Sequence, residues 1–370
     1  MVSKDDADDM VAAPACTTVQ QQQQHRRSSA RRSSKNSSNK MIYREAVAPG
    51  FWIAAEMSCI VASRTSAFQQ IEVVDSTYFG TTLITDGKTQ SAALDEFVYH
   101  ESLVHPAMLQ ALSSTTPSSS LRVFVGGGGE LATAREVLRY GSVAHVVMVD
   151  VDELVVDMCR EHLPAWGGES VLSDPRLELV IGDAYQYLME KTNEESSSFD
   201  VIILDISDPI EAGPGIQLYT KELYAHAKTL LTPNGVFVTQ AGTAESIPHA
   251  SSKDLSCFAP ITNTLREVFS TTIPYSTNIP SFGGDWGFVM ALKNAAHNSS
   301  TTTDNDGSTA AESSSTTIDR WIDQHVTSGG PLRFYDGDSH LSMLHLVKPL
   351  RRAMENDPRI MTRDHPVFMY

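Results

Sequence analysis

Acidic residues follow a series of apolar runs in the middle of the chain. The runs at 121–125, 146–149, 177–181 and 201–204 have the length and composition of buried strands. Stretches with helical spacing separate them, so the pattern predicts alternating strands and helices in an open parallel sheet. In such sheets, ligands bind beyond the carboxyl ends of the strands. The acids at these ends are Glu130, Asp150, Asp183, Asp205 and Asp208.

Five carboxyl groups are more than a nucleoside needs, which indicates that a second ligand is a polycation. The formal net charge is −17, and residues 1–40 contain seven Lys/Arg and four Asp, which leaves −20 on the remainder. This balance argues against nucleic acid, whose binding depends on Lys and Arg contacts to phosphate. It favours electrostatic steering of a cationic ligand, although solubility alone also accounts for an acidic surface.

Composition divides the chain into five segments. We expect a disordered low-complexity tail at 1–41, a small antiparallel β-domain at 42–92, and a Rossmann-like doubly wound sheet at 93–293. A Ser/Thr-rich stretch at 294–317 is expected to be a disordered insertion, and 318–370 a C-terminal segment of ordinary globular composition. The predicted fold class is therefore α/β, with a small β-domain preceding the Rossmann-like sheet.

Cysteine usage and hydropathy constrain the compartment. The four cysteines are scattered without a CxxC pair, which argues against a disulfide framework and a structural zinc site. No apolar run approaches the roughly 18 residues of a membrane span, and the N-terminus lacks the apolar core of a secretory signal. We therefore expect a cytoplasmic protein that binds neither membrane nor nucleic acid.

A glycine-rich loop follows the first strand of the large domain. Gly127, Gly128 and Gly129 open the next helix, and Asp150 ends the following strand 22 residues beyond Gly128. Glycines there allow a backbone to approach a ligand closely, and the later carboxylate can accept hydrogen bonds from ribose hydroxyls. The pair predicts a nucleoside site, although a plain strand-to-helix turn would also favour glycine.

The later acids allow two interpretations each. Asp183 could accept a hydrogen bond from an adenine amino group, or it could simply cap the next helix. Asp205 and Asp208 could hold an ammonium group and accept a proton from an attacking amine, or they could form an Asp turn before proline. Glu211 lies just beyond them and could extend an acidic channel. His100 could have a functional role, or it could be an ordinary structural histidine.

These motifs together resemble those of the polyamine aminopropyltransferases, the spermidine, spermine and thermospermine synthases. The resemblance covers residues 42–293. It is carried by the stretches Phe68–Ile71, Asp86–Gln90, Asp95–Glu101, Gly127–Glu130 with Arg135–Glu136, Gly182–Asp183 and Asp205–Pro209. It implies a Rossmann-like domain of the S-adenosylmethionine methyltransferase type, commonly as a homodimer, and decarboxylated S-adenosylmethionine as co-substrate, with no further cofactor and no metal.

The resemblance also implies a role for each matching residue. Asp205 corresponds to the proton acceptor, Glu130 to the acid that holds the donor's aminopropyl ammonium, and Asp150 to the ribose ligand. The donor-binding residues implied are Gln69, Gln90, Gly128, Glu130, Asp150, Asp183 and Ala184. The residues implied for the acceptor channel are Tyr99, His100, Asp208 and Phe282.

Departures from the spermidine synthase pattern indicate the subfamily. Glu130, His100 and Ile206 stand where spermidine synthases typically have Asp, Gln and Ser, and the chain is more similar to plant-type thermospermine synthases. Leu131 stands where the family usually has glycine. We expect spermidine as acceptor and thermospermine as product, with spermine or spermidine synthase as alternatives. An S-adenosylmethionine-dependent methyltransferase is a further alternative, against which the Asp205/Asp208 pair and the upstream β-domain argue. No catalytic dyad stands out for an NAD dehydrogenase, and the intact Asp205 argues against an inactive paralogue acting as a binding subunit.

Overall fold

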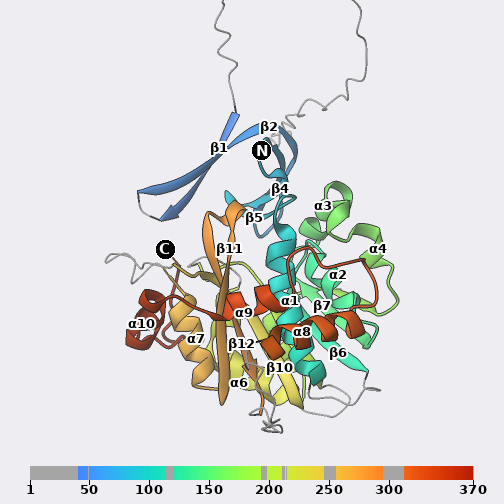
Figure 1. Cartoon of the computed structure of the whole chain (residues 1–370). Helices are drawn as coiled ribbons and strands as arrows, with labels where there is room; N and C mark the ends of the chain where they lie inside the picture. Colours follow the sequence, from blue (N-terminus) through green and yellow to red (C-terminus); the bar gives the residue numbers. More distant parts are fainter. Residues whose placement is uncertain are drawn as a thin grey trace, which may run out of the picture.

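Two sheets organise the chain (Figure 1). The computed structural model describes residues 41–48, 50–113, 120–192, 198–210, 213, 215–245, 256–294 and 312–369. The predicted tail up to residue 40, positions 295–311 of the predicted insertion, and Glu211 lie outside the described residues. None of the described helices combines the length and apolarity needed to cross a membrane.

The N-terminal sheet is antiparallel with its strands in sequence order. The strands are β1 (Met41–Ala48), β2 (Phe51–Thr65), β3 (Gln70–Ser76), β4 (Gly80–Thr85) and β5 (Lys88–Ala92). Asp86 and Gly87 join the last two strands with φ values of 48° and 72°, the left-handed pair that a tight hairpin turn requires. The predicted antiparallel β-domain is confirmed, and its β1–β2 hairpin projects away from the rest of the molecule (Figure 1).

The larger sheet has the order β11-β12-β10-β9-β6-β7-β8. Its strands are β6 (Leu121–Gly127), β7 (Val143–Asp150), β8 (Leu177–Ile181), β9 (Phe199–Asp205), β10 (Leu231–Thr243), β11 (Thr271–Ile279) and β12 (Gly284–Leu292). The five central and outer strands from β10 to β8 pair in parallel, and β12 is antiparallel to both of its neighbours. The strand order reverses at β6, next to β9, which is where such sheets open a crevice for ligands.

Both faces of this sheet are covered by helices. The helices of the domain are α1 (Glu96–Ser113), α2 (Ala132–Leu138), α3 (Glu153–His162), α4 (Gly168–Leu172), α5 (Ala184–Glu190), α6 (Lys221–Leu230) and α7 (Phe258–Arg266), with short 3-10 turns η1 (Pro164–Trp166), η3 (Ile216–Tyr219) and η5 (Pro280–Phe282). Alternate strand residues feed two cores: Val123 and Val201 pack with α1 and α2, while Phe124 and Ile202 pack with α5 to α7.

The C-terminal segment packs back onto the domain. It contains α8 (Glu312–His325), α9 (Gly337–Leu344) and α10 (Lys348–Asn356). The structure therefore differs from the predicted insertion at 294–317, because residues 312–317 are helical. The Glu101 carboxylate on α1 fastens the segment by accepting the backbone N–H groups of Arg333, Phe334 and Tyr335 at 2.9, 2.8 and 2.8 Å.

Helix α1 contains a proline that connects it to β11. Pro106 has no N–H, so the helix cannot form its usual bond to the carbonyl of Ser102. The Tyr275 hydroxyl on β11 donates to that carbonyl instead, at 3.0 Å. The Tyr275 ring also stacks on Phe288, with centroids 5.4 Å apart. These contacts fix α1 against the strand that leads into η5.

Candidate active site

The glycine loop packs directly against the end of β9. Gly127 and Gly128 have φ values of 81° and 77°, and a Cβ at Gly127 would lie 2.1 Å from the carbonyl oxygen of Asp205. The Gly128 N–H donates to that carbonyl at 2.9 Å. Side chains are excluded here by both conformation and space, which is the physical reason for the glycines.

Leu131 continues the loop in a conformation that suits glycine better. Its φ is 76° and its side chain is fully buried in the core shared by α1 and α2. A non-glycine residue in this region costs about 1 kcal/mol or more, which burial of the leucine side chain offsets. The departure from the family's glycine is therefore accommodated by packing.

Asp150 lies beside the loop and is committed to backbone donors. Its carboxylate accepts the N–H groups of Gly129 and Asp152, both at 2.9 Å. Burial raises its pKa to about 6. It keeps lone pairs for further donors, as a carboxylate that binds ribose must.

Gln69 forms a hydrogen bond with Asp152, a residue that was not identified from the sequence. Its Nε2 donates to Asp152 at 3.0 Å, and the Ser66 hydroxyl donates to the same oxygen at 2.6 Å. Asp152 also caps α3 by accepting the Leu154 N–H at 3.1 Å. Its position two residues after Asp150 was the available signal, but a capping role alone would explain it. These bonds join the N-terminal sheet to the loop around Asp150.

Asp183 and its neighbours lie at the end of β8. Asp183 is exposed and caps α5 by accepting the N–H groups of Tyr185 and Gln186 at 2.8 and 3.4 Å. Ala184 is buried against the strands. Gln90 donates to the carbonyl of Lys88 at 3.2 Å and forms no hydrogen bond with the acids at the sheet edge. The cap alternative accounts for the contacts of Asp183, and its role toward adenine stays a prediction.

Both carboxylate oxygens of Asp205 accept hydrogen bonds. The Tyr99 hydroxyl donates to Oδ1 at 2.7 Å, and the Thr133 hydroxyl donates to Oδ2 at 2.6 Å. Burial raises the pKa of Asp205, with His100 opposing the shift. Burial and Asp205 hold the pKa of Tyr99 well above its usual value, so its hydroxyl remains a donor. Thr133 carried no signal in the sequence, since nothing in a short helix marks one threonine.

Aromatic rings and Asp208 lie on the other side of Asp205, in the region predicted to bind the acceptor. Tyr99 lies 5.7 Å from Phe282, and Phe282 lies 4.7 Å from Trp286, in edge-to-face contacts between ring centroids. Asp208 follows β9 on the same loop as Asp205 and accepts a hydrogen bond from Gln240 at 3.3 Å. Burial raises the pKa of Asp208 to about 6. The structure thus brings together Tyr99, Phe282 and Asp205.

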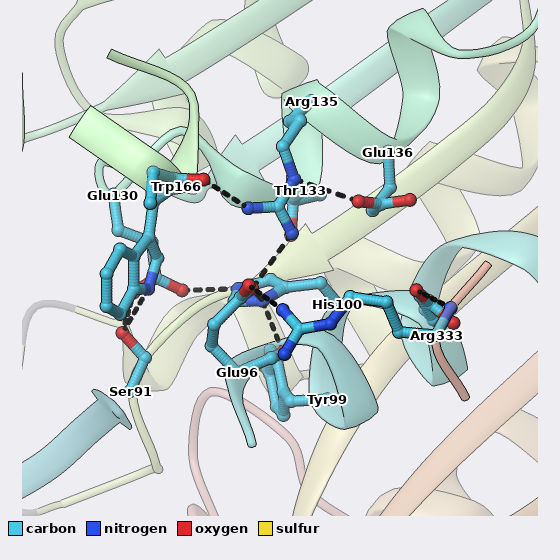
Figure 2. Close-up of polar contacts among 12 residues, drawn as sticks. Ser91, Glu96, Tyr99, His100, Glu130, Thr133, Arg135, Glu136, Trp166 and Arg333 are labelled. Carbon is cyan, nitrogen blue, oxygen red and sulfur yellow. Dashed lines mark hydrogen bonds and ion pairs between the residues drawn. The ribbon is translucent and has the colours of Figure 1, made fainter. Parts of the chain in front are cut away.

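His100 lies deeper than a channel residue. It is fully buried, with Nδ1 3.0 Å from a Glu96 carboxylate oxygen and Nε2 against Glu130 (Figure 2). Its ring, Glu130 and Asp205 place atoms within 4.8 Å of one another, a spacing that metal sites share. Because both ring nitrogens face oxygen acceptors, a doubly protonated ring satisfies them and has no lone pair for a metal ion.

Glu130 has a partner on each oxygen. His100 holds Oε1, and the Ser91 hydroxyl donates to Oε2 while accepting the Trp166 indole N–H at 2.9 Å. Neither Ser91 nor Trp166 was identified from the sequence. Ser91 lies on β5 and Trp166 on η1, and no sequence motif links these segments to the glycine loop.

The chain was compared with known protein families. A family model described as "Spermine/spermidine synthase domain" matches residues 96–303. A polyamine aminopropyltransferase of Aeropyrum pernix is 41% identical over 310 residues, covering 84% of this chain and 89% of the relative. The thermospermine synthase ACAULIS5 of Arabidopsis thaliana is 36% identical over 329 residues, covering 89% and 87% respectively.

A solved structure shares the fold. A spermidine synthase in complex with the transition-state analogue AdoDATO superposes with a TM-score of 0.69 at 25% identity, covering 88% of this chain and 98% of the other. The predicted fold class is confirmed, with one refinement: the large sheet is mixed. The chain therefore belongs to the spermine/spermidine synthase family, the polyamine aminopropyltransferases.

Proposed function

We propose that the chain transfers the aminopropyl group of decarboxylated S-adenosylmethionine to spermidine and forms thermospermine and 5′-methylthioadenosine. The observation that carries the proposal is Asp205, a carboxylate held by Tyr99 and Thr133 beside the glycine loop. Its raised pKa makes it a stronger base than an exposed aspartate. Its fixed orientation suits a group that must meet an amine at a defined place.

The reaction needs little beyond position and a base. The amine lone pair attacks the methylene carbon beside the sulfonium, the carbon–sulfur bond breaks, and its electron pair returns to sulfur. Neutral methylthioadenosine leaves, and the amine proton passes to Asp205. Holding the reacting atoms in line supplies much of the rate. Acids at the strand ends, without a matching cation for a carboxylate, favour the decarboxylated donor over ordinary S-adenosylmethionine.

We assign donor and acceptor to opposite sides of the glycine loop. Asp150 accepts from the ribose, Glu130 receives the aminopropyl ammonium, and Asp183 with Ala184 lies toward adenine. Gln69 supports this side through Asp152, and we assign Gln90 and Gly128 to it from the family resemblance. On the other side, the aromatic rings of Tyr99 and Phe282 flank the methylene chain, and Asp208 attracts a distal ammonium group.

Spermidine is the proposed acceptor because more than one acid lies along that side. Its longer chain places two further ammonium groups where a diamine has one. The similarity to the Arabidopsis thermospermine synthase, and the departures from the spermidine synthase pattern at Glu130, His100 and Ile206, support extension at the aminopropyl end. Thermospermine rather than spermine is the expected product.

Product analysis tests this proposal. The protein is incubated with decarboxylated S-adenosylmethionine and spermidine carrying an isotopic label in its butyl segment. Fragmentation should place the new aminopropyl group on the aminopropyl arm. Attachment to the butyl end gives spermine and overturns the product assignment, while faster use of putrescine overturns the acceptor assignment. Methylation by ordinary S-adenosylmethionine would contradict the reaction itself.

We also propose that the chain forms a homodimer. The β1–β2 hairpin exposes Ile42, Phe51 and Trp52 at 52%, 53% and 61%, and β1 is an edge strand. Exposed apolar side chains on an unpaired edge favour association with a second copy. Light scattering coupled to size-exclusion chromatography should give twice the chain mass, and Trp52→Glu should shift it toward the monomer. A monomeric wild-type protein would contradict the proposal.

A further inference from the structure

Alternately charged side chains run from the end of α2 to the glycine loop, and Figure 2 shows this series from Glu136 to Glu130. In order, this charge chain consists of Arg139, Glu136, Arg135, Glu96, His100 and Glu130. The first three links are 2.9, 2.9 and 2.8 Å long, and the Glu96–His100 link is 3.0 Å. Arg139 also donates to the carbonyl of Ser328 at 3.2 Å, so the first member of the charge chain contacts the C-terminal segment.

His100 is the member of the charge chain that meets the donor side. Its Nδ1 faces the Glu96 backbone carbonyl at 2.7 Å, which can only accept, so Nδ1 carries a proton. Its Nε2 faces the Glu130 carboxylate, which also accepts. Although burial opposes the charge, Glu130 and Glu96 raise the pKa of His100 to about 10. The ring is therefore an imidazolium between two carboxylates.

Glu96 keeps this imidazolium in place. It is 5% exposed and joins His100 to Arg135, with Arg333 stacked on the neighbouring Phe97 ring at 3.7 Å. Burial works against its charge, but His100 and Arg135 lower its pKa. Loss of the Glu96 charge would leave Nδ1 with neutral acceptors only, and Arg135 without its ion pair to α1.

Glu130 is oriented by the partners that this arrangement supplies. A carboxylate has about four lone-pair positions. His100 takes one on Oε1 and Ser91 takes one on Oε2, which fixes the plane of the group and leaves one position on each oxygen. Those two positions are the ones an incoming ammonium group would use.

We propose that Glu96 is a positioning residue for the donor's aminopropyl group, acting through His100 on Glu130. The inference rests on the proposed function, because it requires Glu130 to receive the aminopropyl ammonium. Glu96 itself touches no substrate in this arrangement. Its effect is confined to the ammonium end of the donor, since the ribose side is held by Asp150 and its backbone partners.

Comparison of two ligands tests the proposal. Methylthioadenosine has the nucleoside of the donor and lacks the aminopropyl group. Glu96→Gln should raise the KM for the decarboxylated donor by about tenfold or more, the usual scale for a charge-assisted hydrogen bond. The Kd of methylthioadenosine should stay within about twofold. His100→Leu, which removes both ring nitrogens and so the link between Glu96 and Glu130, should reproduce this separation if Glu96→Gln folds poorly.

A neighbouring carboxylate provides the matched control. Glu101 is also buried on α1, but its carboxylate accepts backbone N–H groups of the C-terminal segment and is not among the hydrogen-bond partners of the His100 ring, which are Glu96 and Glu130. Glu101→Gln should reduce stability without separating the two ligands. Equal changes for donor and methylthioadenosine in both Glu96→Gln and His100→Leu, or an unchanged donor KM in the folded variants, would overturn the positioning role. A wild-type protein without aminopropyl transfer would instead overturn the proposed function.

Discussion

Two sets of acids surround the glycine loop and differ in what neutralises them. The paired acids, Glu96, Glu130 and Glu136, each contact a histidine or arginine. The unpaired acids, Asp150, Asp205 and Asp208, form no ion pair with any residue that the structure describes. Cations lower the pKa values of Glu96 and Glu136 despite burial, while burial raises those of the unpaired acids.

Glu96 and Glu136 should therefore contribute to stability with the opposite sign to the unpaired acids. A carboxyl group with a lowered pKa stabilises the fold above its ordinary pKa, and that stability is lost as the pH falls through the lowered value. A carboxyl group with a raised pKa binds more protons when folded. Its unfavourable contribution grows as the pH rises from about 4 to about 6. At neutral pH Glu96 and Glu136 stabilise the fold, and the unpaired acids are the groups whose unfavourable charge a cationic or hydroxylated ligand would offset.

The largest expected effect is on stability at a paired acid. Glu136 is 2% exposed and contacts His105, Arg135 and Arg139. Glu136→Gln leaves these cations partly uncompensated and should lower the free energy of unfolding by about 3–5 kcal/mol at pH 7. Denaturant titration measures it. The matched control is Asp174→Asn, whose more exposed pair with Arg176 should be worth about 1 kcal/mol or less. Similar losses of unfolding free energy in the two variants would show that the buried paired acid contributes no more than a more exposed ion pair.

At an unpaired acid, the effect should fall on turnover instead. Asp205→Asn keeps the shape of the side chain and removes its basicity. We expect kcat to fall by about a hundredfold or more, which corresponds to about 2.7 kcal/mol, while methylthioadenosine still binds. Steady-state kinetics and calorimetry give the two quantities. Near-normal turnover would show that another group accepts the proton.

Asp150 should affect binding by a smaller amount. Asp150→Ala removes the proposed acceptor for the ribose hydroxyls and also frees the Gly129 N–H. Methylthioadenosine affinity should weaken by about 1–3 kcal/mol, measured by calorimetry. An unchanged affinity would place the nucleoside elsewhere. The Asp150→Asn variant keeps one acceptor oxygen, so its affinity for methylthioadenosine should lie between those of the wild type and Asp150→Ala.

The smallest effect should appear in the pH dependence of acceptor binding. The pKa of Asp208 is about 6, so its carboxylate forms as the pH rises through that value. The KM for spermidine, at saturating donor, should therefore fall by about fivefold between pH 5 and 7, equivalent to about 1 kcal/mol. Asp208→Asn should flatten this change. Persistence of the full pH dependence in that variant would assign it to another group.

Much of the fold was predictable because its signals are local. The strands β6 to β10 are apolar runs, and the turn at Asp86–Gly87 has its own residue chemistry. The placement of Asp150 and Asp205 at one edge followed from the alternation of strands and helices. Tyr99 and Phe282 came from family resemblance, since 183 positions separate them and no spacing rule links them.

The charge chain could not be predicted in the same way. Glu96 and Arg135 are 39 positions apart, and His100 and Glu130 are 30 apart. Their pairing depends on how α1 packs against α2, which local propensity does not specify. The same limitation applies to Gln69, whose partner Asp152 lies on the other sheet's domain, and to Glu101, whose partners are more than 200 positions away.

The proline of α1 constrains the order in which two positions can change. Pro106 leaves the Ser102 carbonyl without its helical donor. In the present chain, Tyr275→Phe would therefore leave this buried carbonyl without a hydrogen bond. With alanine at 106, the helix supplies its own donor and the same change at 275 becomes tolerable. A double-mutant cycle should reveal this coupling. A lineage moving from tyrosine to phenylalanine at 275 would thus find the path open after position 106 has changed, and obstructed before it.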